Sequence, residues 1–142
     1  MGEPFESEGL VSLASRNDFQ TTLGRLTDAM TTHQATIFTV IDHAAGAKDA
    51  GLALPPTTVV IFGDPRAGTS LMQARRTTGL DLPLKVLVWQ DPSGEVWLSY
   101  NDPAWIARRH GLDPGALPTT ARMATALKLF TEAAVGPESK DR

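Results

Sequence analysis

The sequence predicts a single α+β domain with about five strands in a mixed or antiparallel sheet that is covered by helices. The 142 residues are 42% hydrophobic and 20% charged, a composition that suits one domain with its own core. Runs of β-branched residues alternate with stretches whose apolar residues recur every three or four positions. Two strand-like runs also flank a turn, which predicts an antiparallel hairpin. The predicted order is β-α-β-α-β-α-β-β-α-α.

The first three elements follow from local patterns. Residues 9–15 (GLVSLAS) predict a short strand, and Asn17 or Asp18 offers an N-cap for the helix that follows. Apolar residues then recur at helical spacing, at Phe19, Leu23, Leu26 and Met30. Residues 36–41 (TIFTVI) are rich in β-branched side chains and predict the second strand.

The middle of the chain predicts a helix, a strand and a second helix. Residues 43–51 are rich in alanine and predict a short helix that ends at Gly51. Residues 57–62 (TTVVIF) predict a strand, and their continuous apolar run indicates a central position covered on both faces. Asp64 can cap a helix that starts at Pro65 and extends to about residue 77.

The last part predicts a hairpin and two helices. Residues 84–89 and 95–100 are strand-like and flank the turn residues 90–94 (QDPSG). Asn101 or Asp102 then caps a helix that starts at Pro103 and ends at Gly111. A final helix over residues 119–135 carries one apolar face, formed by Met123, Leu127, Phe130 and Ala134.

These elements divide the chain into three parts. Residues 1–8 are polar and predict a flexible N-terminus. Residues 9–112 hold the main α+β domain. Residues 113–142 form a loop and the last helix, for which two placements stay open: the helix packs on the same domain or on a partner subunit.

Composition excludes several classes of protein. The net charge is −3, from 13 basic and 16 acidic residues, which argues against a nucleic-acid partner. The absence of cysteine excludes disulfides, thiolate zinc sites and iron–sulfur clusters. No apolar run approaches the roughly 20 residues of a membrane helix, and the N-terminus lacks the pattern of a signal peptide. We therefore expect a cytoplasmic protein without a membrane partner.

A series of short motifs occurs in order along the chain and resembles the domain of unknown function 302 family. The resemblance covers about residues 10–112, so the segment after Gly111 lies outside it. It implies a compact α+β fold, a bacterial or archaeal source and a homodimer, and it supplies no substrate, cofactor or catalytic residue. The motifs that carry it include Asp42-His43, Leu54-Pro55-Pro56-Thr57, Ile61-Phe62-Gly63-Asp64-Pro65, Gly68-Thr69, Leu71-Met72, Leu80-Asp81-Leu82-Pro83-Leu84-Lys85, Trp97-Leu98-Ser99-Tyr100-Asn101-Asp102-Pro103 and Arg109-His110.

Polar residues gather where three predicted strands pass into helices. These junctions are Asp42-His43, Gly63-Asp64 and Tyr100-Asn101-Asp102. If the strands are parallel, the junctions meet at one edge of the sheet, where ligand crevices form and helix N-termini suit an anion. Lys85 could add a positive charge. The alternative is that the aspartates only cap helices. The candidate ligand-binding residues are Asp42, His43, Asp64, Lys85, Tyr100 and Asn101.

Two hypotheses about function stay open. The first is a non-catalytic module that binds a small ligand or a partner and forms a homodimer. The second is an enzyme of unknown reaction whose site, near His43, Asp64 and Lys85, uses His43 as a base. The three histidines have no spacing typical of a metal site, and no cofactor fingerprint occurs, so we expect neither a metal nor a cofactor. Two basic clusters, 75–76 and 108–110, are interpreted as solvated helix faces.

Overall fold

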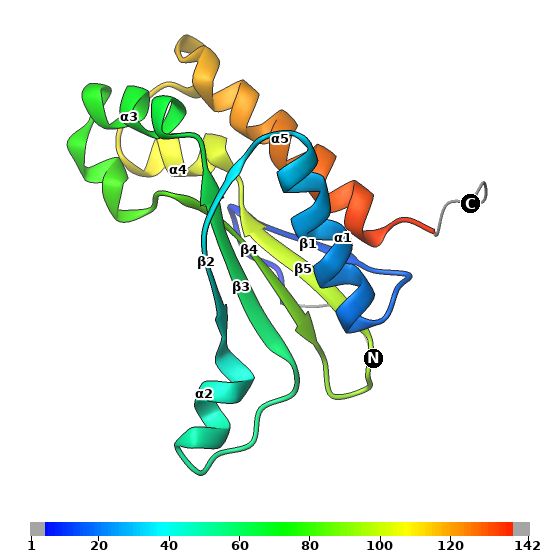
Figure 1. The fold of residues 1–142 in the computed structure, drawn as a ribbon. Helices are drawn as coiled ribbons and strands as arrows, with labels where there is room; N and C mark the ends of the chain where they lie inside the picture. Colours follow the sequence, from blue (N-terminus) through cyan, green and yellow to red (C-terminus); the bar gives the residue numbers. More distant parts are fainter. Residues whose placement is uncertain (1–4, 138–142) are drawn as a thin grey trace.

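The computed structural model describes residues 5–137 and contains one five-stranded sheet in the order β1-β5-β4-β3-β2 (Figure 1). Each neighbouring pair of strands is antiparallel. The α+β class and the predicted order of elements are confirmed. The strands are β1 Leu10–Ala14, β2 Thr36–Asp42, β3 Thr57–Gly63, β4 Leu84–Gln90 and β5 Val96–Asn101. The helices are α1 Phe19–Thr32, α2 His43–Asp49, α3 Pro65–Ala74, α4 Pro103–Arg109 and α5 Pro118–Val135. Two 3₁₀ turns, η1 Arg76–Leu80 and η2 Pro114–Ala116, complete the chain.

The prediction that β3 is the central strand, covered on both faces, is wrong. β4 occupies the centre of the sheet, and β3 lies between β4 and the edge strand β2. Thr58, Val60 and Phe62 of β3 are buried, and the residues between them are partly exposed. A helix layer therefore covers only one face of β3. The apolar run misled the prediction because Val59 and Ile61 are apolar although no helix covers them.

The helix predicted for residues 65–77 is shorter than expected. α3 ends at Ala74, because Arg75 has an extended backbone with φ −154° and ψ 109°. The 3₁₀ turn η1 follows at once. Thr77, Thr78 and Gly79 all have low helix propensity, which favours the break at this position.

Aspartate side chains fix the starts of four helices. The carboxylate of Asp18 accepts a hydrogen bond from the backbone N–H of Thr21 at 2.8 Å. Asp42, Asp64 and Asp102 cap α2, α3 and α4 in the same way. Proline occupies the first turn of α3 and of α4, where its missing N–H costs nothing. Capping thus accounts for all three aspartates at the predicted junctions.

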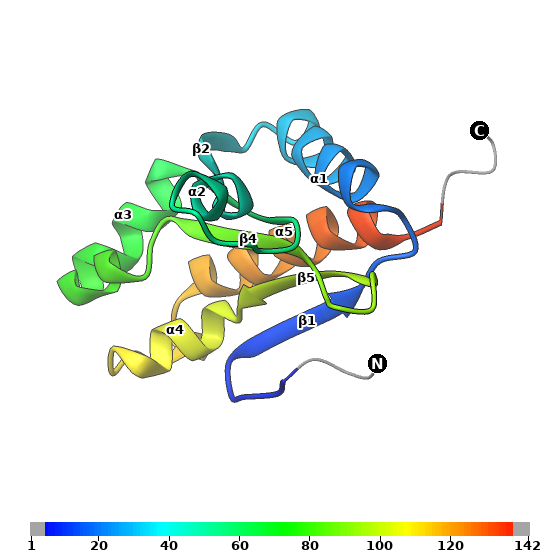
Figure 2. The ribbon, with the colours of Figure 1, turned by 90° about the horizontal axis from the view of Figure 1, so that it is seen from below.

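Helices α1 and α5 lie side by side on one face of the sheet (Figures 1 and 2). Within the described residues, α5 packs on this chain's own sheet, through the predicted apolar face and Phe130 in particular. Residues 5–8 form a loop and the start of a turn, and residues 1–4 of the predicted flexible segment lie outside the described part. The core between helices and sheet includes Leu26, Met30, Val60, Phe62, Val86, Val88, Leu98, Ile106, Leu127 and Phe130.

Candidate functional site

The three predicted junctions do not meet at one edge of the sheet. Asp42, at the end of β2, pairs with Thr58 at the start of β3, and Gly63, at the end of β3, pairs with Thr36. Asp42 and Asp64 therefore lie at opposite ends of the sheet, as the separation of α2 from α3 in Figure 1 shows. The expectation of a shared edge is wrong because it required parallel strands, and antiparallel strands alternate in direction.

The proposed grouping of His43, Asp64 and Lys85 is also wrong. His43 starts α2 at the far end of the sheet and is exposed. Lys85 pairs with Ile61 and so points to the face of the sheet that the helices leave open. Its Nζ donates to the carbonyl oxygen of Pro83 at 3.0 Å. The structure therefore does not bring His43 together with Asp64 and Lys85, as the enzyme hypothesis required.

Two other candidates, Tyr100 and Asn101, lie at the same end of the sheet as Asp64. Asn101 is exposed and pairs with Leu10 of the edge strand β1. Tyr100 is partly buried against the core, as expected for a residue that anchors the end of the sheet. Neither residue lines either of the two pockets described below.

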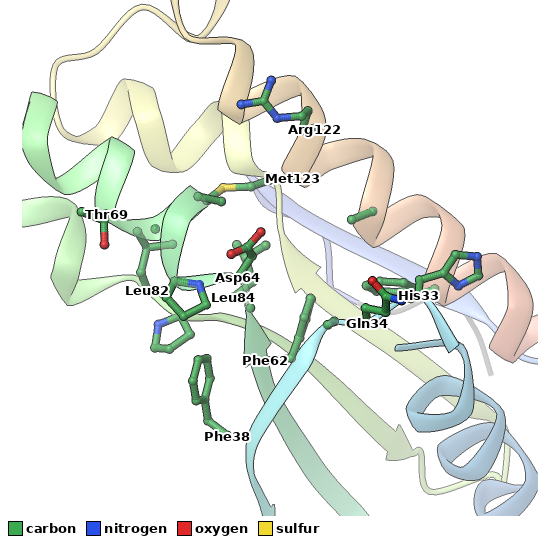
Figure 3. A pocket seen from close by; sticks show the side chains of 18 of the residues that line it. His33, Gln34, Phe38, Phe62, Asp64, Thr69, Leu82, Leu84, Arg122 and Met123 are labelled. Carbon is green, nitrogen blue, oxygen red and sulfur yellow. The ribbon is translucent and has the colours of Figure 1, made fainter. Parts of the chain in front are cut away.

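A pocket of about 510 Å³ lies between α3, α5 and the adjoining ends of β2 and β3 (Figure 3). We call it the α3–α5 pocket. Its wall is mainly apolar, and Asp64, the predicted candidate, contributes one of its few polar side chains. The apolar side chains that line it include Phe38, Phe62, Met72, Leu82, Leu84, Met123 and Phe130.

Three of the polar side chains around the α3–α5 pocket, those of Asp64, Arg122 and His33, have partners within the chain. The Asp64 carboxylate accepts from the backbone N–H of Arg66 at 3.0 Å, and the Arg66 Nε lies 3.6 Å away. Arg122 donates to the hydroxyl of Thr119, and the Nδ1 of His33 lies 2.9 Å from the carbonyl oxygen of Ala29. A ligand therefore gains mostly from apolar contact here.

A second pocket of about 510 Å³ lies beside α2, at the other end of the sheet. Asp42 lines it, together with Phe19, Lys48 and Leu54. The Asp42 carboxylate is occupied as the cap of α2, where it accepts from the backbone N–H of Ala45 at 2.9 Å. Since α2 buries none of its residues, this pocket has a less rigid wall than the α3–α5 pocket.

A cluster of polar side chains that the sequence did not reveal joins η1 to the end of α4. The Nε2 of His110 lies 2.6 Å from Asp81, and its Nδ1 lies 2.8 Å from the hydroxyl of Thr77. Arg109 donates to both carboxylate oxygens of Asp81, at 2.8 and 2.9 Å. We call these four residues the Asp81 clamp.

The Asp81 clamp holds one wall of the α3–α5 pocket, because Asp81 directly precedes the lining residues Leu82 and Pro83. It also corrects the interpretation of His110 as part of a solvated helix face, because the His110 side chain is only 8% exposed. No local spacing links residues 28 or 29 positions apart. The one signal was that Asp81 and Arg109-His110 both occur in the motifs of the resemblance.

The surroundings of Tyr100 predict that folding is sensitive to alkaline pH. Burial raises the pKa of its hydroxyl above the usual value of 10.0, and the carboxylates of Asp102 and Glu132 raise it further. The stability that this contributes is complete below about pH 10 and is lost as the pH rises through the folded-state pKa. We expect wild-type protein to lose more stability than Tyr100→Phe in urea titrations as the pH rises above about 10.

Tyr100 is the sole tyrosine, so tyrosinate absorbance follows its titration directly. A midpoint at or below the value for free tyrosine would contradict the expected shift. Equal losses of stability for wild type and Tyr100→Phe at high pH would do the same. Measurements near neutral pH, where both proteins carry no charge at this position, serve as the control.

In residues 5–137, no helix has the length and apolar character needed to cross a membrane. In the same part of the chain, no three acidic or histidine side chains lie close enough together to hold a metal ion.

By its fold and its pocket, this chain is a small α+β domain. It has one antiparallel sheet, one layer of helices and an apolar pocket of the size of a small ligand. The chain belongs to the family described as Domain of unknown function DUF302, whose model matches residues 11–130. The match extends into α5, beyond residue 112 where the resemblance was expected to end.

A solved structure shares the fold. It is the crystal structure of an uncharacterized conserved protein DUF302 from Bacillus stearothermophilus, with a TM-score of 0.78 and 15% sequence identity. The alignment covers 90% of this chain and 99% of that chain. At this identity the likeness establishes the fold alone.

Curated relatives from Brucella carry another name. The fluoride-specific ion channel FluC 1 of Brucella suis biovar 1 (strain 1330) is 47% identical over 128 residues, which cover 90% of this chain and 50% of that protein. The FluC 1 protein of Brucella abortus biovar 1 (strain 9-941) is also 47% identical over 128 residues, 90% of this chain and 47% of its own length. The chain thus spans about half the length of the curated relatives it matches.

Proposed function

We propose that this chain is a non-catalytic module that binds a small, mainly apolar ligand in the α3–α5 pocket. The observation that carries the proposal is the pocket itself. Its volume of about 510 Å³ falls within the range of roughly 300–1,000 Å³ for small-molecule sites. The aromatic rings of Phe62 and Phe130 form part of its wall, and Asp64 and Arg122 place a few polar groups beside it.

The wall of the pocket favours an apolar ligand. Burial of apolar surface contributes about 25 cal/mol per Å² removed from water. The polar groups of His33, Asp64 and Arg122 already have hydrogen-bond partners within the chain. We therefore expect them to orient a bound ligand more than to add to its binding free energy. Figure 3 shows Asp64 among the apolar side chains, where it could orient a polar end of the ligand.

The absence of a catalytic role is supported by the placement of the titratable groups. The hydroxyl, imidazole and carboxylate of Thr77, His110 and Asp81 are bonded to one another, and none of them lines the pocket. Asp64, which does line it, is engaged by the backbone of Arg66. A ligand in the pocket therefore meets no base paired with a nucleophile.

Filling the pocket is expected to abolish binding. Ala126 lines the pocket from α5, and Ala126→Trp places an indole in the space that a ligand would occupy. Anilinonaphthalene sulfonate, whose fluorescence rises in apolar sites, serves as the probe. We expect wild-type protein to bind it and Ala126→Trp to bind at least about tenfold more weakly, a loss of about 1.4 kcal/mol.

Leu129→Trp is the matched control, because Leu129 lies on the same helix, is 43% exposed and does not line the pocket. It should bind the probe like wild type. Thermal unfolding of all three proteins, with and without the probe, shows whether binding stabilises the fold. Weak binding by wild type, or equal binding by wild type and Ala126→Trp, would sink the proposal.

A second candidate function rests on the Brucella relatives. They are named as fluoride-specific ion channels, and this chain matches about half of each. We infer that a module of this kind works beside a channel polypeptide, and that ligand binding in the α3–α5 pocket regulates it. The identity of 47% over 90% of this chain supports the association.

The test uses the half of the Brucella suis protein that this chain does not match. That half is produced in detergent and mixed with this chain, and co-elution on size exclusion is measured. We expect the two to co-elute. Two results together would reject the association with a channel: separate elution, and an unfolding temperature of this chain that is the same in sodium fluoride as in sodium chloride. The proposal of ligand binding in the α3–α5 pocket would remain.

A further inference from the structure

The wall of the α3–α5 pocket changes in polarity from its buried base to its exposed rim. The side chains of the wall that are buried are all apolar, and they are Phe62, Leu84, Met123 and Phe130. The polar side chains of the wall are all exposed, and they are His33, Gln34, Asp64, Thr69 and Arg122. A ligand that fills this space meets apolar side chains at the base and solvated polar groups at the rim. The pocket therefore suits an amphipathic molecule.

The apolar part of the wall favours a flexible chain. Met72 and Met123 both line the pocket, and methionine side chains adapt their shape to the groups that pack against them. The Sδ of Met72 lies 3.0 Å from the position that a Cβ would take at Gly79, so the missing side chain at residue 79 makes room for Met72. An alkyl chain, which also adapts its shape, suits such a wall better than a rigid ring system does.

Arg122 is the lining residue that carries a permanent positive charge. Its guanidinium has five N–H donors, and its Nη2 donates to the hydroxyl of Thr119 at 3.2 Å. The ion pairs within 4.0 Å that residues 5–137 form use Arg66, Arg109 and His110, so Arg122 has no carboxylate partner in this part of the chain. The planar guanidinium matches a carboxylate, which it can bind through two parallel hydrogen bonds.

Asp64 is the competing group at the rim, because its carboxylate favours a positively charged ligand. This charge already has a partner, since the Nε of Arg66 lies 3.6 Å from the carboxylate, which also accepts from the Arg66 backbone N–H. In the view of Figure 3, Met123 lies between the side chains of Asp64 and Arg122. Asp64 therefore repels a negatively charged head group from its own side of the pocket, and the head group is directed toward Arg122.

We propose that the ligand of the α3–α5 pocket is a single-chain amphiphile with a carboxylate head group, of the fatty-acid type. Arg122 binds the carboxylate, and the alkyl chain lies on the buried base. This inference rests on the proposed function, because it assigns a chemical class to the ligand of the same pocket. Arg122 selects the head group, whereas the alkyl chain supplies most of the binding free energy, since water screens an ion pair at an exposed position.

The test compares three ligands that share an alkyl chain and differ in the head group: decanoate, decanol and decylamine. Isothermal titration calorimetry measures the affinity of each ligand near neutral pH, below its micelle concentration. We expect wild-type protein to bind decanoate about tenfold more tightly than decanol, and decylamine more weakly than either. Ala126→Trp, which fills the pocket, should weaken the binding of all three.

Arg122→Gln removes the positive charge at an exposed position, so the variant is expected to fold like wild type. It should bind decanoate about tenfold more weakly, at the level of decanol. Its affinity for decanol should match that of wild type, which also shows that the pocket is intact. Lys128→Gln is the matched control, because Lys128 lies on the same helix, is exposed and does not line the pocket. It should bind all three ligands like wild type.

Equal affinity of wild type for decanoate and decanol overturns this proposal, and so does a preference for decanoate that survives in Arg122→Gln. Tightest binding of decylamine also overturns it and assigns the head group to Asp64. If none of the three ligands binds while anilinonaphthalene sulfonate does, the fatty-acid class is wrong and the proposed function remains. If anilinonaphthalene sulfonate does not bind either, the proposed function fails together with this inference.

Discussion

Phe62→Ala is expected to lower the free energy of unfolding by about 3–5 kcal/mol. The Phe62 side chain is 2% exposed and lies in the core between β3 and the helix layer. Its ring meets that of Phe130 edge to face, with 5.7 Å between centroids and an angle of 75°. Removal of the Phe62 ring leaves a cavity that is continuous with the α3–α5 pocket. Because the combined space is large, we expect that the neighbouring side chains do not fill it.

Phe38→Ala is the matched control for Phe62→Ala. Phe38 lines the same pocket but is 48% exposed, so its loss should cost less than about 1 kcal/mol. Urea titrations measure both variants, and probe binding is followed in parallel. Similar losses of stability for the two variants would contradict the assignment of Phe62 to the core and Phe38 to the rim of the pocket.

Asp81→Ala is expected to cost about 2–3 kcal/mol, because it breaks the Asp81 clamp. The Asp81 side chain is 14% exposed, and its loss removes the hydrogen-bond acceptor of His110, which is only 8% exposed. A buried imidazole N–H without a partner keeps its full desolvation penalty. Since Asp81 precedes the pocket residues Leu82 and Pro83, the variant should also bind the apolar probe more weakly.

Arg109→Ala separates the two contacts of Asp81. The Arg109 side chain is 45% exposed, so this ion pair is screened by water and should be worth less than about 1 kcal/mol. Urea titration at neutral pH compares both variants with wild type. A larger cost for Arg109→Ala than for Asp81→Ala would show that the contact with His110 is not the important one.

Much of the fold could be predicted because its helices and turns depend on interactions between residues that are close in sequence. The cap at Asp64 followed by Pro65 marks a helix start within two residues, and the stripe from Phe19 to Met30 marks one helical face. The hairpin of β4 and β5 follows from a turn of a few residues. Each of these signals involves residues that lie close together in the chain, so it can be recognised directly in the sequence.

The candidate site was predicted only in part. Asp64 does line the α3–α5 pocket, but His43 and Lys85 lie elsewhere. The error came from one assumption, the parallel direction of the strands that lead into α2 and α3. The wall of the pocket combines α3, α5 and the ends of two strands, and no short pattern joins segments so far apart in the chain.

The sequence by itself determined which residues form helices and strands, where the aspartate caps lie and that the class is α+β. Only the tertiary structure decided the strand order, the separation of Asp42 from Asp64, and the meeting of Asp81 with His110. The physical reason is the range of the interactions. Caps, turns and helical stripes are local, whereas the direction of strand pairing and the packing of α5 on the sheet depend on the whole chain.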